Sequence, residues 1–114
     1  MFIVSFISAT LLPLGSELCL IVLCPPEAEE RLLDLMLMLP NTTVFTSKPT
    51  AAHGLTHENL DQNEQVLGRA RATEVEVIFA ADDKATLIDA LRQQFVGAGL
   101  RYWITPVIES GEIA

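Results

Sequence analysis

Two histidines and two carboxylates lie close together in one polar segment of this sequence. The side chains that could bind a metal ion there are His53, His57, Glu58 and Asp61. Imidazole and carboxylate groups suit zinc, nickel, copper or cobalt. The two histidines would share one face of a helix, although Gly54 disfavours a helix at this point. A divalent transition-metal site is therefore one hypothesis for the segment, and a solvated polar loop is the alternative.

Three arginines form a second group of candidate ligand-binding residues. Arg69 and Arg71 lie in a stretch expected to be a strand, where their spacing puts both on one face, and Arg101 lies near the start of another expected strand. Guanidinium groups bind carboxylate or phosphate through paired hydrogen bonds. These residues predict an anion site, and the alternative is that they pair with the many surface carboxylates.

The sequence offers little support for catalysis. Both histidines lie in the polar segment, where the fixed hydrogen-bond geometry that a nucleophile and its base require is hard to hold. Cys19 and Cys24 do not form a CxxC pair, and we expect both to be buried thiols. Neither a glycine-rich dinucleotide fingerprint nor a Walker motif is present. We therefore expect a protein that is not an enzyme and has no nucleotide cofactor.

Charge and hydropathy narrow the range of partners. The chain has 114 residues, with seven basic against fifteen acidic side chains and a net charge of −8. Nucleic acid would be repelled by this charge on average. The apolar start, residues 1–16, is too short to span a bilayer and is interrupted by Pro13. We expect residues 1–16 to be an N-terminal arm or an edge strand, and residues 17–114 to be one folded cytoplasmic domain.

Hydrophobic periodicity predicts the elements that must position these side chains. A continuous apolar run, Leu18 to Leu23, is typical of a buried central strand. Apolar residues at helical spacing follow the double proline, and a second helical stripe contains Leu87, Ile88, Leu91 and Phe95. The predicted order is strand 18–23, helix 26–39, strand 42–48, long polar loop 49–65, strand 67–81, helix 82–96 and strand 100–108.

Two such strand–helix–strand halves predict a particular α+β architecture. We expect a ferredoxin-like βαββαβ sandwich, with an antiparallel four-stranded sheet and both helices on one face. The other face of the sheet needs a cover, and association of several copies is the simplest one. We therefore expect a homo-oligomer.

Two segments of the second half resemble a known family. Residues 63–71 (NEQVLGRAR) and 95–107 (FVGAGLRYWITPV) are similar to a PII-like family of unassigned function within the nitrogen regulatory PII superfamily. The resemblance covers the chain from about Glu17 to its end. It implies the ferredoxin-like fold, a homotrimer whose sheets face each other, and a partner-contacting T-loop at about residues 49–65.

The resemblance also implies a function. Members of the family tend to be encoded beside heavy-metal efflux pumps, which implies a signalling role in metal homeostasis and a pump component as partner. The leading hypothesis is a PII-like regulator that senses a metal ion or small anion and changes its T-loop contacts. One alternative is a structural or interaction module without a ligand, and another is a small enzyme that uses the open sheet as a cleft.

Overall fold

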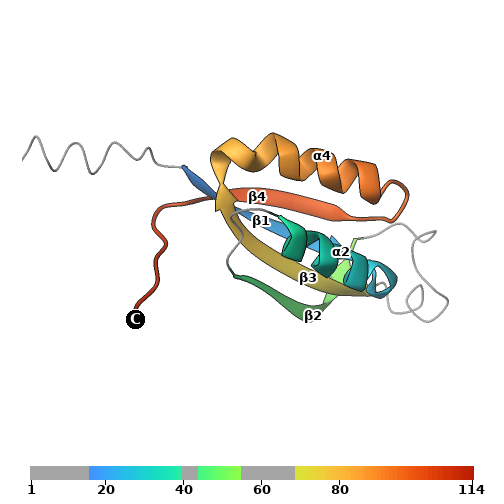
Figure 1. Ribbon diagram of the computed structural model, residues 1–114. Coiled ribbons are helices and arrows are strands. Elements are labelled where there is room, and N and C mark those ends of the chain that lie inside the picture. The colour runs from blue at the N-terminus through green and yellow to red at the C-terminus, as the bar shows by residue number, and fades with distance from the viewer. Residues whose placement is uncertain (1–15, 40–43, 55–68) are drawn as a thin grey trace, which may run out of the picture.

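The computed structural model describes residues 16–39, 44–54 and 69–114 of the chain (Figure 1). Helices α2 and α4 each follow a short 3-10 turn, at Pro26–Ala28 and Ala81–Asp83 respectively. The elements are strand β1 (Glu17–Cys24), helix α2 (Glu29–Met38), strand β2 (Phe45–His53), strand β3 (Arg69–Ala80), helix α4 (Lys84–Gln94) and strand β4 (Arg101–Val107).

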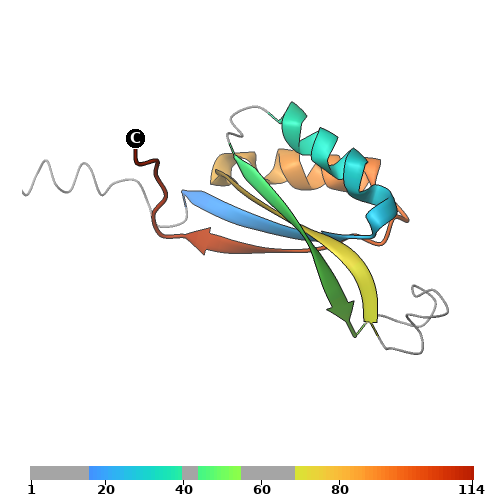
Figure 2. The ribbon, with the colours of Figure 1, turned by 90° about the horizontal axis from the view of Figure 1, so that it is seen from below.

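The four strands form one antiparallel sheet in the order β2-β3-β1-β4. Both helices lie on one face of it, as the view from below shows (Figure 2). This arrangement confirms the predicted α+β, ferredoxin-like architecture. Strand β1 lies between β3 and β4, and side chains on both of its faces are buried, since Ile21 is buried as well as Leu20 and Val22; this agrees with its nearly unbroken apolar run.

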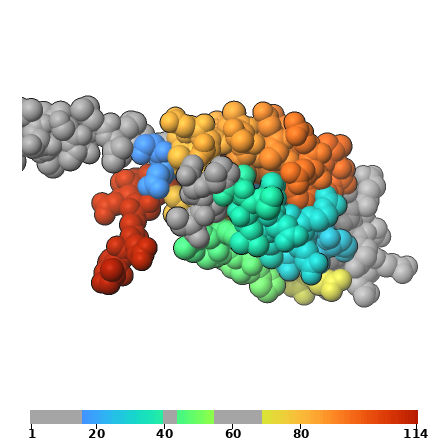
Figure 3. All heavy atoms as spheres, viewed as in Figure 1, coloured from blue at the N-terminus to red at the C-terminus, as the bar shows by residue number. Residues whose placement is uncertain are grey.

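The core fills the space between the sheet and the two helices, which lie side by side over this face of the molecule (Figure 3). Burying one large aliphatic side chain contributes about 1.5–3 kcal/mol, so this layer supplies most of the stabilisation. The side chains with almost no exposed surface are Leu20, Val22, Cys24, Leu32, Met36, Val75, Val77 and Leu87.

Strand β2 differs from its predicted position. The sequence places its end at Lys48 and starts the polar loop at Pro49, whereas the strand continues to His53. Proline cannot donate a ladder hydrogen bond and is tolerated on edge strands. Because β2 pairs only with β3, Pro49 fits opposite Thr73 without breaking the sheet. Residues 49–53, predicted to belong to the polar loop, are therefore part of β2.

Burial along β3 changes face partway along the strand. From Thr73 to Phe79 the odd-numbered residues are buried beneath the helices, as the predicted alternation requires. Before this point the even-numbered Ala70 and Ala72 are buried instead. The end of β2 and the start of β3 project away from the helices (Figure 2). The start of β3 therefore has different neighbours from its end.

The predicted N-terminal arm, residues 1–16, lies almost entirely outside the described residues. The first contact that the structure describes is at Ser16, whose carbonyl accepts a hydrogen bond of 2.8 Å from the Ala81 backbone N–H. Neither helix in the described parts of the chain is long and apolar enough to cross a membrane.

Candidate functional site

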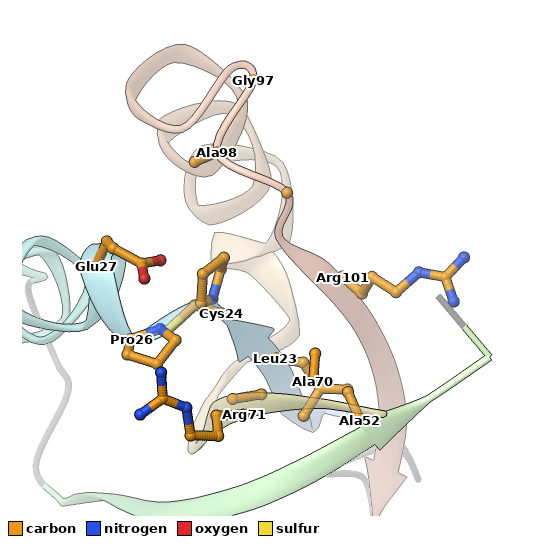
Figure 4. A pocket seen from close by; sticks show the side chains of 13 residues that line it. Leu23, Cys24, Pro26, Glu27, Ala52, Ala70, Arg71, Gly97, Ala98 and Arg101 are labelled. Atoms are coloured by element: carbon orange, nitrogen blue, oxygen red, sulfur yellow. The ribbon is translucent and has the colours of Figure 1, made fainter. Parts of the chain in front are cut away.

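A cavity of about 280 Å³ lies at the end of the sheet where β1 finishes and β4 begins (Figure 4). Four segments distant in sequence surround it: the end of β1 with the following turn, the end of β2, the start of β3, and the loop between α4 and β4. The lining residues are Leu23, Cys24, Pro25, Pro26, Glu27, Ala52, Ala70, Arg71, Ala72, Gly97, Ala98, Gly99 and Arg101.

Prolines and glycines shape two walls of this cavity. Pro25 is extended, with φ −62° and ψ 152°, and Pro26 then starts the 3-10 turn. Gly97 and Gly99 both have φ +77°, in the left-handed region that residues with a Cβ rarely adopt. A Cβ on Gly99 would lie 3.9 Å from Pro25 Cγ, so the two walls approach each other closely.

Small side chains keep the sheet side of the cavity open. Ala52 on β2 pairs with Ala70 on β3, and Ala72 follows on the same face. All three are buried, yet each adds only a methyl group above the sheet. A Val or Leu at any of these positions would occupy space that is open here.

Two of the three predicted anion-binding arginines line the cavity. Arg71 lies on β3 and Arg101 on β4, and both residues are exposed. The Arg71 side chain turns toward Pro26, whereas Arg101 extends away from it on the other side (Figure 4). Arg69 shares the face of Arg71, as predicted from its spacing, but does not line the cavity. The two arginines therefore lie on opposite sides of the cavity, with the Arg71 guanidinium beside its wall and the Arg101 guanidinium directed away from it (Figure 4).

A buried polar contact lies next to the cavity wall. The Thr73 hydroxyl donates a short hydrogen bond to the Glu29 carboxylate, which ties β3 to the start of α2. Burial, followed by the negative charge of Glu29, raises the pKa of the neighbouring Cys24 thiol. Both cysteines are free thiols, but only Cys24 is buried as expected, whereas Cys19 is half-buried. A thiol held in its protonated form is a poor nucleophile and a poor metal ligand.

The predicted metal ligands are mostly beyond the described residues. His53 is exposed at the end of β2, opposite Arg69, while His57, Glu58 and Asp61 lie outside the described ranges. Within residues 16–39, 44–54 and 69–114, no group of three or more His, Cys, Asp or Glu side chains is placed to hold a metal ion. The four-residue metal site remains a prediction.

Sequence reasoning missed most of the cavity walls. It selected Arg71 and Arg101 but not the prolines, glycines and alanines that surround them. The double proline after an apolar strand and the Gly-Ala-Gly loop after a helix were visible signals of sharp turns. Their meeting in space depends on the pairing of β1 with β4, which residue spacing does not reveal.

Solved structures of several proteins share this fold. A DUF3240 family protein from Shewanella baltica OS155 matches with a TM-score of 0.73 and 18% identity, over 87% of this chain and 98% of that chain. A Thermus thermophilus protein described as a putative PII-like signalling protein matches with a TM-score of 0.58 and 14% identity, over 80% and 86%. GlnK from B. subtilis in complex with ATP matches with a TM-score of 0.57 and 11% identity, over 82% and 85%.

The TM-scores show a common fold, the one found in PII-like proteins, and at these low identities they show the fold alone. No curated protein matches the chain. A family model described as "Protein of unknown function (DUF3240)" matches residues 14–114, which is nearly the whole chain. This protein therefore belongs to the DUF3240 family and has a PII-like, ferredoxin-like fold.

Proposed function

We propose that this protein is a PII-like regulator that binds a small anion in the cavity between β1, β3 and the loop after α4. The observation that carries the proposal is the placement of Arg71 and Arg101 on two sides of one cavity. The Arg71 guanidinium supplies charge and paired donors of the kind that bind carboxylate or phosphate, and Arg101 would add a second guanidinium if its exposed side chain turned toward the cavity.

The size and charge of the cavity favour a small ligand. Its volume of about 280 Å³ lies just below the usual range for small-molecule sites, which begins at about 300 Å³. Glu27 also lines it, and its carboxylate would repel a ligand that carries several negative charges. A small mono- or dianion fits these limits better than a nucleoside triphosphate does.

The position of the cavity suggests how a ligand would be signalled. Ala52 and Ala70 lie at the end of β2 and the start of β3, at the base of the segment that the PII resemblance identifies as the T-loop. A ligand held there contacts both strands that carry this segment. We infer that anion binding changes the contacts of the T-loop with a protein partner, which is an order–disorder type of switch.

Calorimetric titration with inorganic phosphate and with ATP tests the anion site. We expect phosphate to bind more tightly than ATP, and Arg71→Gln to weaken phosphate binding by about tenfold or more, because a charged hydrogen-bond donor is lost. Ala72→Leu should abolish binding by filling the cavity without changing the charge.

Arg69→Gln is the matched control, because Arg69 shares the strand and face of Arg71 but not the cavity. If Arg69→Gln weakens phosphate binding as much as Arg71→Gln does, the attraction is a general surface effect and the proposed site is wrong. A wild-type protein that binds neither phosphate nor ATP would also contradict the proposal.

The metal hypothesis and the efflux partner belong to the same proposal. We propose that His53, His57, Glu58 and Asp61 bind a divalent transition metal and that the partner is a component of a heavy-metal efflux system. Zinc as a further titrant, compared with a His53→Ala/His57→Ala double variant, tests the metal ligands. Equal zinc affinity in both proteins would remove the metal from the proposal.

An interaction module without a ligand is the alternative function. Exposed Ile78 and Trp103 on the face of the sheet opposite the helices favour it, because such apolar surface suits protein contacts. A ligand at 100 times its Kd adds about 2.7 kcal/mol to the free energy of unfolding. If neither phosphate nor zinc raises the melting temperature, the alternative is preferred.

A further inference from the structure

A second cavity, of about 460 Å³, lies between helix α4 and strand β4, on the face of the sheet that carries the helices. Val22 on β1 is at its base, and side chains of α4 and of the following loop surround it. Its lining residues are Val22, Ile88, Leu91, Arg92, Phe95, Val96, Gly97, Gly99, Leu100 and Tyr102.

The lining of this second cavity is almost entirely apolar. Ile88, Leu91 and Phe95 of the α4 region are buried members of the core, and Leu100 packs against them. Apolar cavities of this size that contain a few polar groups are typical sites for small organic ligands. The apolar wall predicts a ligand with a hydrocarbon tail or ring.

Arg92 and Tyr102 supply the polar groups at the rim. Both residues are exposed, and Arg92 lies in the last turn of α4. Arg92 forms no hydrogen bond or ion pair with another residue of the described ranges. A single guanidinium with a phenol hydroxyl nearby suits one carboxylate group at the mouth of an apolar cavity.

We propose that the α4–β4 cavity binds a small hydrophobic monocarboxylate, with its apolar part over Val22 and its carboxylate at Arg92 and Tyr102. This site is separate from the anion cavity: the two have only Gly97 and Gly99 in common, which form a wall between them. Arg71 belongs only to the first site and Arg92 only to the second, so each can be tested alone.

Octanoate and n-octanol are the probes. Each has eight carbon atoms, but octanoate carries a negatively charged carboxylate and octanol a neutral hydroxyl. We expect octanoate to bind the wild-type protein more tightly than octanol in calorimetric titrations. Arg92→Gln should weaken octanoate binding by roughly fivefold, as expected for one exposed ion pair, and leave octanol binding unchanged. Tyr102→Trp should weaken both probes, because the larger ring occupies the cavity.

Lys84→Gln is the matched control, because Lys84 is also an exposed basic residue of α4 but does not line the cavity. It should leave octanoate binding unchanged. Arg71→Gln should leave unchanged the octanoate binding that depends on Arg92, because Arg71 does not line this cavity, and it would remove only octanoate bound at the first site. The proposal is overturned if octanol binds as tightly as octanoate, or if Lys84→Gln has the same effect as Arg92→Gln. It is also overturned if Tyr102→Trp changes the subunit count, because a second copy would then cover the cavity.

Discussion

The Cys24 thiol shows how one residue responds to its position between the core and the cavity. It has almost no exposed surface, and both its burial and the charge of Glu29 raise its pKa, while the Thr73 backbone N–H offsets part of the effect. An acid whose pKa is higher in the folded state keeps its proton after the unfolded chain has lost it. The stability that the protonated Cys24 thiol contributes is therefore fully present below the thiol pKa of the unfolded chain. It is lost as the pH rises through the higher thiol pKa of the folded protein.

We predict that the loss of stability caused by Cys24→Ala becomes smaller as the pH rises. The variant should be destabilised by about 1 kcal/mol near neutral pH, because a buried sulfur is removed. The difference in unfolding free energy between wild type and variant should shrink above pH 9.0, the ordinary thiol pKa. Urea denaturation from pH 7 to 10 measures it. A difference that grows with pH would show that the folded protein stabilises the thiolate instead.

Also for single residues, the spacing of Arg69 and Arg71 predicted which face of the strand they occupy, but it did not predict which residues surround them. Arg69 and Arg71 do share a face of β3, because side chains alternate along any strand. Of these two residues only Arg71 lines the cavity, where the turn at Pro26 and Glu27 forms a neighbouring wall. That neighbour is more than forty positions away in the chain, so no local pattern could place it.

Among the elements, the two helices are joined by one side chain. The Arg31 guanidinium of α2 donates a 2.8 Å hydrogen bond to the Gln94 carbonyl at the end of α4. Its Cζ atom also lies 4.8 Å from the centre of the Phe95 ring. Arg31 therefore satisfies a terminal helix carbonyl and fixes the start of the loop that separates the two cavities.

We predict that Arg31→Ala lowers the free energy of unfolding by about 1 kcal/mol, because it removes an exposed charged hydrogen bond and a cation–π contact. Arg31→Lys should recover only part of this loss, since an ammonium group cannot reproduce the planar stacking. Urea denaturation measures both variants. Glu30→Ala, a neighbouring exposed position of the same helix, is the control. Equal midpoints for Arg31→Ala and Glu30→Ala would contradict the prediction.

Element types and their order were predictable, whereas element ends were not. The core stripe of α4 has a clear helical periodicity and β1 is a continuous apolar run, and both lie where predicted. The end of β2 was misplaced because Pro49 normally signals a break, and the sequence does not reveal that β2 is an edge strand. The change of buried face at Ala72 was invisible because alanine contributes weakly to a hydrophobic pattern.

At the scale of the whole molecule, the sheet face opposite the helices carries exposed apolar side chains. Ile21 lies opposite Trp103 on this face, and Cys19 lies opposite Ile78. Trp103 is 45% exposed and Ile78 is 40% exposed in a single chain. Glu76 borders the patch, so the surface is apolar at its centre and charged at its edge. Surfaces of this composition are typical of contacts between subunits.

We predict that three copies associate through this face, as the PII resemblance implies, and that Trp103→Ser reduces the particle to single chains. Removing a partly exposed aromatic ring at the centre of an interface commonly costs about 2 kcal/mol or more, roughly a thirtyfold loss in affinity. Light scattering gives the subunit count. Trp103 is also the only tryptophan in the chain, so a red shift of fluorescence on dilution reports exposure of the same side chain.

Tyr102→Ser is the control for Trp103→Ser. It shows whether a lower subunit count comes from the loss of this sheet face or from the loss of any aromatic side chain on β4. Tyr102 is adjacent to Trp103 and 43% exposed, but it points to the opposite face of the sheet. The subunit count should fall for Trp103→Ser and stay at three for Tyr102→Ser. A fall in both variants would place the subunit contact on β4 as a whole edge, which would also cover the α4–β4 cavity. If the wild-type protein is a monomer, the prediction of three copies is wrong. The apolar face would then be expected to bind a different protein, because exposed apolar patches mark interaction sites.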